Sequence, residues 1–131
     1  MPTHSAHIRV RYAETDNMGM AYYANYFVWF EVGRCELLRS LGGSYRQLEM
    51  DGVMLPVIEA HCEFQEPARY DDELAITTTG TLLSMIRVEF RYKVTRRPDR
   101  ATLAVGKTVH AAIDPQGQPR RLPSQIRTVL T

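Results

Sequence analysis

The hydrophobic positions along this chain change their period twice, from two residues to between three and four and back to two. In residues 7–12, apolar and polar residues alternate strictly, and Ile8, Val10 and Tyr12 share one face. This alternation predicts a strand with one buried face, in which Tyr12 points inward at the strand's end. Acids, polar residues and a glycine then predict a loop over residues 13–23.

From about Ala24, apolar residues recur one helical turn apart as far as Gly42-Gly43, which predicts one long helix that ends there. The apolar stripe consists of Tyr26, Phe30, Gly33, Leu37 and Leu41, widened by Phe27 and Leu38. The first two turns are apolar on nearly all sides, so other elements must enclose them. A second, short helix is predicted between Ser44, as its cap, and Gly52.

After Pro56 the pattern predicts strands almost to the end of the chain. Residues 57–64, 74–82, 86–94 and 103–113 alternate or are rich in β-branched residues. In the last of these segments, every second residue from Leu103 to Ile113 is expected on the buried face, with Lys107 as an interruption. A short helix is predicted after Pro123.

This order of elements predicts an α+β fold in which an antiparallel sheet curves around the long helix. Residues 1–131 are expected to form a single domain, because a chain of this length buries a sufficient core. The net charge of +1 gives no long-range attraction to nucleic acid or anionic membranes. No run reaches the ~20 apolar residues of a membrane span and no signal-peptide pattern is present, so a cytoplasmic location is expected. Cys35 and Cys62 are expected to be buried thiols.

The loop that leads into the long helix carries the strongest candidate for chemistry, Asp16. A helix start offers unpaired N–H groups and a partial positive charge, which favour a nearby carboxylate and can hold a developing oxyanion. A turn aspartate without a chemical role is the alternative for Asp16. Glu14 is a neighbouring acid, and the residues alone do not rank the two.

The string RYAETDNMGMAYYANY, from Arg11 to Tyr26, and the segment from Phe30 to Leu38 resemble the signature of hotdog-fold acyl-CoA thioesterases of the 4-hydroxybenzoyl-CoA thioesterase type. The Tol-Pal-associated thioesterases are a close branch of that family. The resemblance covers essentially the whole chain. It implies the hotdog fold, a homodimer or homotetramer with active sites at subunit interfaces, and a short-chain or aromatic acyl-CoA as substrate.

The resemblance also implies roles for individual residues. Asp16 matches the catalytic carboxylate, and Gly19 matches the glycine before the helix. Tyr23 stands where the 4-hydroxybenzoyl type has tyrosine and many Tol-Pal-associated members have histidine, while Tyr12 matches a tyrosine four residues before the aspartate. The residues assigned to the substrate and coenzyme A are Ala24, Asn25, Ser84, Arg87 and Arg91. The two arginines are assigned for their positive charge, which phosphates require, and an outer sheet face of alternating charge explains them equally well. Coenzyme A is part of the substrate, and since no zinc spacing or dinucleotide motif is present, no metal or bound cofactor is expected.

Two mechanisms remain open for Asp16, which could attack the thioester carbonyl directly or act as a general base on water. In both, backbone N–H groups near Tyr23 and Ala24 would stabilise the oxyanion. Two other functions compete with hydrolysis: a dehydratase or hydratase on the same fold, and a non-catalytic acyl-thioester binding module. Tyr23 in place of a histidine counts against the dehydratase.

Two further groups of charged residues favour structural interpretations. Glu59 and His61 share one face of a predicted strand, where a solvated surface is favoured over a general-base pair. In the long helix, Glu31, Arg34 and Glu36 are expected to form a set of ion pairs and hydrogen bonds, because they lie at helical spacing.

Overall fold

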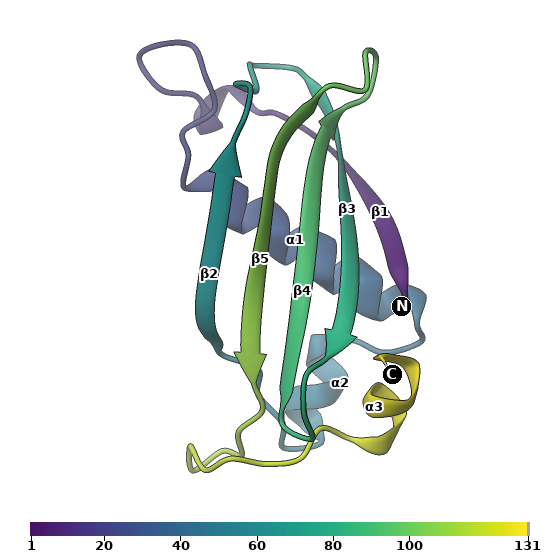
Figure 1. Ribbon diagram of the computed structural model, residues 1–131. Helices are drawn as coiled ribbons and strands as arrows, with labels where there is room; N and C mark the ends of the chain where they lie inside the picture. The colour runs from purple at the N-terminus through teal and green to yellow at the C-terminus, as the bar shows by residue number, and fades with distance from the viewer. Residues whose placement is uncertain (131) are drawn as a thin grey trace.

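One antiparallel sheet of five strands, with one long helix laid across its face, makes up most of the protein. A computed structural model describes residues 1–130. The elements in chain order are β1 (Thr3–Arg9), the 3-10 turn η1 (Tyr12–Glu14), α1 (Asn25–Ser40), α2 (Tyr45–Met50), β2 (Val57–Phe64), β3 (Glu73–Leu82), β4 (Arg87–Arg96), β5 (Thr102–Ala111) and α3 (Ser124–Leu130). The strand order is β1-β3-β4-β5-β2, and α1 lies behind the sheet in Figure 1. The predicted α+β arrangement is confirmed.

The helix α1 packs its apolar stripe on the sheet, as predicted. Phe30 is fully buried and stacks on Tyr92 of β4 with ring centroids 4.2 Å apart. At Gly33 the helix approaches β3 so closely that a Cβ would lie 2.4 Å from the hydroxyl oxygen of Thr78. The short helix α2 also begins as predicted, because the Ser44 hydroxyl accepts a hydrogen bond from the N–H of Gln47.

A single chain leaves part of α1 and the edge strand β2 uncovered. Phe27 and Val28 near the start of α1 are 37% and 52% exposed, so the expected enclosure of the helix is incomplete. Strand β2 pairs only with β5, and Ile58 and Phe64 of β2 are about half exposed. The protein therefore has an apolar surface where the free edge of β2 meets the start of α1.

The first strand begins and ends earlier than the alternation predicts. β1 ends at Arg9, and Tyr12 lies in η1 with 76% of its surface exposed, its ring packed edge-on against Tyr70. The carboxylate of Glu14 accepts a hydrogen bond from the N–H of Arg11, which turns the chain out of the sheet. The prediction that Tyr12 points inward is wrong for this reason.

Strand β5 presents the opposite face to the core from the one predicted. Thr108 and His110 are buried, whereas Lys107 lies on the outer face of the sheet together with Val105. A register shift near Thr95 displaces the start of β5, so that Leu103 and Ala104 are both buried. The two polar side chains are accommodated by hydrogen bonds: His110 bonds the carbonyl of Leu55 and the hydroxyl of Thr108, each at 2.9 Å.

None of the helices within residues 1–130 is long and apolar enough to cross a membrane. Cys35 and Cys62 are half-buried free thiols, less enclosed than predicted, and burial raises the pKa of both.

Burial of His110 makes the stability of the fold depend on pH. Burial lowers the pKa of His110 from 6.5 to about 4, because the imidazolium would lose its hydration. The unfolded chain therefore takes up a proton near pH 6.5 that the folded chain accepts only near pH 4. As a result, the free energy of unfolding decreases as the pH drops from about 6.5 to about 4, by up to about 3 kcal/mol. Urea unfolding between pH 4 and 7 measures this loss. We expect a shallower pH dependence for His110→Gln than for the wild type, and equal slopes would contradict the assignment.

Candidate active site

A cavity of about 320 Å³ opens at the start of α1, and Asp16 lines it. Its walls come from the loop before α1, from the first turn of α1 and from the end of β2 with the residues that follow. The lining residues are Asp16, Met18, Met20, Ala21, Tyr23, Tyr26, Phe64, Gln65, Glu66 and Pro67. Most of these walls are apolar, and Asp16 and Glu66 are the carboxylates among them.

The carboxylate of Asp16 is fixed by one of its two oxygens. Oδ1 accepts hydrogen bonds from the N–H groups of Met18, at 2.9 Å, and Met20, at 3.2 Å. Gly19 closes this turn with a φ of +75°, a conformation that glycine adopts without strain. No donor within residues 1–130 bonds Oδ2, so one oxygen of a rigidly held carboxylate remains free for chemistry.

The same turn occurs a second time in the chain, after β5. Oδ1 of Asp114 accepts from the N–H groups of Gln116 and Gln118, and Gly117 has a φ of +82°. The local geometry of Asp16 is therefore that of a turn aspartate, which is the alternative to a chemical role. Only the turn of Asp16 lies beside the cavity at the start of α1.

The carboxylate of Glu14 joins the loop to α1 by accepting a buried hydrogen bond from Trp29. Glu14 is only 7% exposed, and its carboxylate accepts hydrogen bonds from the N–H of Arg11 and from the indole N–H of Trp29. The side-chain amide of Asn25 adds a third connection by donating to the carbonyl oxygens of Glu14 and Tyr22. Glu14 thus serves as an anchor for the loop, and the amide of Asn25 is engaged in positioning it.

The two residues just before α1 leave their backbone donors available. The N–H groups of Asn25 and Tyr26 donate to the carbonyl oxygens of Tyr22 and Tyr23. The N–H of Tyr22 donates to the carbonyl oxygen of Glu14. Within residues 1–130, the N–H groups of Tyr23 and Ala24 have no hydrogen-bond acceptor. They are unpaired donors at the positive end of the helix dipole, where negative charge is stabilised.

The structure brings Tyr23 to the cavity and keeps Tyr12 away from it. Tyr23 is 59% exposed, and its ring packs edge-on against Phe64 on the rim of the cavity. Tyr12 packs against Tyr70 and does not line the cavity. Tyr26 forms a wall instead, and burial raises the pKa of its hydroxyl, which stays protonated.

Three residues assigned to coenzyme A lie away from Asp16. Ser84 and Arg87 lie in and after the β3–β4 turn, at the end of the sheet opposite the start of α1 in Figure 1. The Ser84 hydroxyl accepts hydrogen bonds from the N–H groups of Ile86 and Arg87, which shapes that turn. Arg91, on the outer face of β4, pairs with Glu89 at 2.8 Å. One chain therefore does not bring these residues to the Asp16 cavity.

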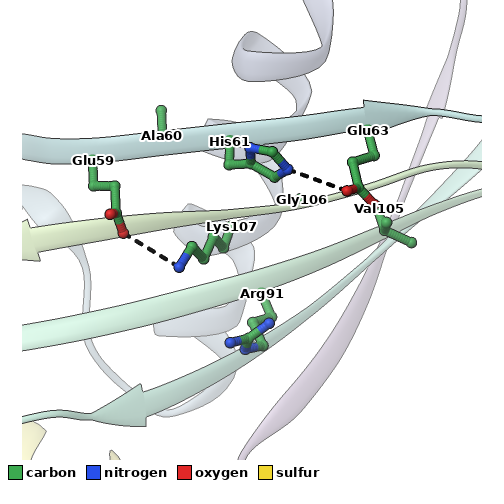
Figure 2. A pocket seen from close by; sticks show the side chains of 8 residues that line it. All are labelled: Glu59, Ala60, His61, Glu63, Arg91, Val105, Gly106 and Lys107. Carbon is green, nitrogen blue, oxygen red and sulfur yellow. Dashed lines mark ion pairs between the residues drawn. The ribbon is translucent and has the colours of Figure 1, made fainter.

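The outer face of the sheet carries a second hollow, of about 580 Å³, that Glu59 and His61 line (Figure 2). Glu59 pairs with Lys107 at 3.4 Å, and His61 pairs with Glu63 at 3.5 Å, so the two do not pair with each other. Both side chains are more than half exposed. The predicted solvated face is confirmed.

The predicted ion pairs among Glu31, Arg34 and Glu36 are not formed within residues 1–130. Glu36 pairs with Arg39, but Arg34 has no carboxylate within 4.0 Å in residues 1–130. The guanidinium of Arg34 instead lies beside the hydroxyls of Tyr45 and Tyr92. The interpretation of Arg34 as a member of that set is wrong, because its side chain points toward α2 and the sheet.

The walls formed by Phe64 to Pro67 were not predicted from the sequence. These residues lie about fifty positions from Asp16 in the chain. The pairing of β2 in the sheet and a backbone hydrogen bond of 2.8 Å from the N–H of Ala21 to the carbonyl of Ala68 bring them to the loop. Among residues 1–130, no group of three or more histidine, cysteine or acidic side chains is arranged to hold a metal ion.

Comparison with known proteins gives one consistent family. The model of the thioesterase superfamily matches residues 18–103. YneP of Bacillus subtilis, provisionally named an acyl-CoA thioesterase, is 45% identical over 71 residues, and the match spans 54% of this chain and 51% of YneP, about half of each. Acyl-CoA thioester hydrolase YbgC of Escherichia coli is 31% identical over 91% of this chain and 89% of its own.

The fold has close counterparts among solved structures. The 1,4-dihydroxy-2-naphthoyl-CoA thioesterase Slr0204 from Synechocystis superposes with a TM-score of 0.91 at 25% identity, covering 98% of this chain and 95% of that one. The hotdog fold implied by the sequence is thereby confirmed.

Removing the Glu14 carboxylate tests whether it anchors the loop. Glu14→Ala would leave the indole N–H of Trp29 and the N–H of Arg11 without a partner, and we expect a loss of about 1–3 kcal/mol of unfolding free energy. Urea unfolding followed by the fluorescence of Trp29, the single tryptophan, measures it. The control is Glu36→Ala, which removes an exposed ion pair and should cost at most about 1 kcal/mol. Equal losses in both variants would contradict the anchoring role.

Proposed function

This chain belongs to the thioesterase superfamily, and on that premise we propose that it hydrolyses an acyl-CoA thioester to the free acid and coenzyme A, with Asp16 as the reacting carboxylate. One observation carries the proposal. The free Oδ2 of Asp16 and the unpaired N–H of Tyr23 belong to residues that line the same cavity. A carboxylate and an oxyanion donor at one site are the two groups that acyl transfer requires.

Two routes use these groups. As a general base, Asp16 takes a proton from water, the hydroxide adds to the carbonyl carbon, and the C–S bond breaks while the proton passes to the sulfur of coenzyme A. As a nucleophile, Asp16 displaces the thiolate and forms a mixed anhydride, which water then hydrolyses. In both routes the N–H groups of Tyr23 and Ala24 stabilise the oxyanion. Each donor contributes on the order of 3 kcal/mol to lowering the barrier.

Short-chain and aromatic acyl groups fit the cavity best. At about 320 Å³ it is at the small end of ligand sites, and Met18, Met20, Tyr26 and Phe64 give it apolar walls. An aromatic ring could pack edge-on against Phe64 and Tyr26, whose rings already pack in that way. The aromatic substrate named for the Synechocystis relative supports this choice.

Self-association would complete the surface beside this site. The free edge of β2 and the exposed Phe27 and Val28 form an apolar surface next to the cavity wall at Phe64. A second copy that pairs antiparallel along β2 would cover this surface. Because the two copies would then run in opposite directions, the end of the second copy's sheet that is remote from its own Asp16 would lie toward Asp16 of the first copy. Ser84 and Arg87 of that copy are then candidates for binding the coenzyme A phosphates, with Arg91 further along β4.

The Asp16 assignment is tested by Asp16→Asn, which keeps the shape of the side chain and removes the carboxylate. We expect its kcat to fall on the order of a hundredfold or more on a panel of aromatic and short-chain acyl-CoAs, followed by release of free thiol. The matched control is Asp114→Asn, which alters the other turn of the same geometry and should retain activity.

Each outcome of this comparison is decisive. Near-full activity of Asp16→Asn would refute the catalytic role. An equal loss in both variants would mean that turn stability, rather than chemistry, is affected. Absence of turnover with the whole panel would favour the acyl-thioester binding module over the enzyme.

Self-association is tested by the mass of the protein in solution. Sedimentation is expected to give two or four chains. Ile58→Lys places a charge on the apolar surface of β2 and should shift the mass toward one chain and lower kcat/KM. Leu83→Lys is the control, because Leu83 has the same 49% exposure but lies in the β3–β4 turn. A wild type that sediments as one chain contradicts the proposal.

A further inference from the structure

A second carboxylate, that of Glu66, lies at the cavity that Asp16 lines. Glu66 belongs to the wall of this cavity, and its side chain is 54% exposed, so it stands at the solvent-facing rim. No lysine, arginine or histidine of residues 1–130 lines the cavity. The lining therefore carries two negative charges and no positive one. One belongs to the carboxylate that we propose to react, and the other to a residue without a part in that reaction.

The backbone holds Glu66 at this place. Its N–H donates to the carbonyl oxygen of Leu103 at 3.2 Å. The next residue is Pro67, and a residue before proline is restricted to extended backbone conformations. The carbonyl oxygen of Ala68 then accepts from the N–H of Ala21 at 2.8 Å, which connects this wall to the loop before α1. The charge of Glu66 is therefore a fixed part of the site.

The counter-charge of Glu66 is incomplete. In residues 1–130, Arg96 is the cation within 4.0 Å of its carboxylate, and the same guanidinium serves three acids. It lies 3.5 Å from Glu66, 3.8 Å from Asp72 and 2.9 Å from Asp99. Its printed hydrogen bonds to a carboxylate all go to Asp99. One positive charge thus faces three negative ones, and Glu66 is not its nearest partner.

An acyl group with a carboxylate of its own would bring a further negative charge into this cavity. Apolar walls exclude water, which strengthens the repulsion between like charges. Charges that share so small a space lie on the order of a Debye length apart or closer, about 8 Å at physiological ionic strength, so salt does not remove the repulsion. An uncharged acyl group of the same length meets no such cost.

We propose that Glu66 is a specificity-determining residue, which makes the site reject acyl groups that carry a free carboxylate and accept uncharged ones of the same length. The proposal rests on the acyl-CoA hydrolysis proposed above. It concerns charge and not size, because a like charge placed against one substrate discriminates between two of equal shape. The substrates rejected in this way are the coenzyme A half-thioesters of dicarboxylic acids.

The test compares the hydrolysis of valeryl-CoA and glutaryl-CoA, followed by release of free thiol. Their acyl chains have equal carbon number and differ in a terminal carboxylate in place of a methyl group. The wild type is expected to have the higher kcat/KM for valeryl-CoA. Glu66→Gln keeps the shape of the side chain and removes its charge, so we expect it to reduce the ratio of the two kcat/KM values about tenfold.

The matched control is Glu63→Gln, because Glu63 lies three residues earlier on the outer face of the sheet, where it pairs with His61 (Figure 2). Its side chain is 67% exposed and does not line the Asp16 cavity, so this variant should keep the ratio of the wild type.

A second variant separates charge from packing. Arg96→Gln removes the partial counter-charge of Glu66 and should increase the ratio, whereas Glu66→Gln should decrease it. A loosened cavity wall would shift the ratio in the same direction in both variants, so opposite shifts identify the charge as the cause.

The proposal is refuted if the wild type hydrolyses both substrates equally well, if Glu66→Gln keeps the ratio of the wild type, or if Glu63→Gln lowers it as much. Should Glu66→Gln not fold, an unchanged or smaller ratio in Arg96→Gln refutes it as well. Failure of the underlying reaction has a different signature: no acyl-CoA is hydrolysed, or Asp16→Asn stays active. The first of these also overturns the role of Glu66, whereas the second leaves the ratios to decide it.

Discussion

The close approach of α1 to the sheet is the constraint on which the rest of the structure depends. A Cβ at Gly33 would collide with Thr78, and a Cβ at Gly106 of β5 would lie 2.6 Å from the ring of Phe30. Because both positions lack side chains, Phe30 can stack on Tyr92 and the helix lies in one fixed position across the strands. That position sets where α1 begins, and therefore where its unpaired N–H groups point.

The position of Asp16 is set by the hydrogen bonds that connect the preceding loop to α1. Glu14 is a buried carboxylate with two donors, and one of these, the indole of Trp29, belongs to α1. The loop between Glu14 and Tyr22 is closed at both ends, so the turn of Asp16 is held beside the first helical residues. The buried carboxylate of Glu14 thus positions the turn of Asp16, the carboxylate that we propose to react.

One surface of a single chain is more apolar than an ordinary solvent-exposed surface. It consists of the free edge of β2 and the start of α1, and it is the surface that the proposed second copy would cover.

The sequence by itself determined the elements and the family, because hydrophobic period, caps and the Arg11 to Tyr26 string are local properties. It did not determine which face of β5 is buried: Thr108 and His110 are polar, and only their partners Tyr92 and Leu55, distant in the chain, make burial favourable. The sequence singled out Asp16 by its place before the long helix and by the resemblance, although the turn itself is not distinctive, since Asp114 forms the same one. Only the tertiary structure decided that the turn of Asp16 lies beside an apolar cavity, because the walls of that cavity come from segments remote in the chain.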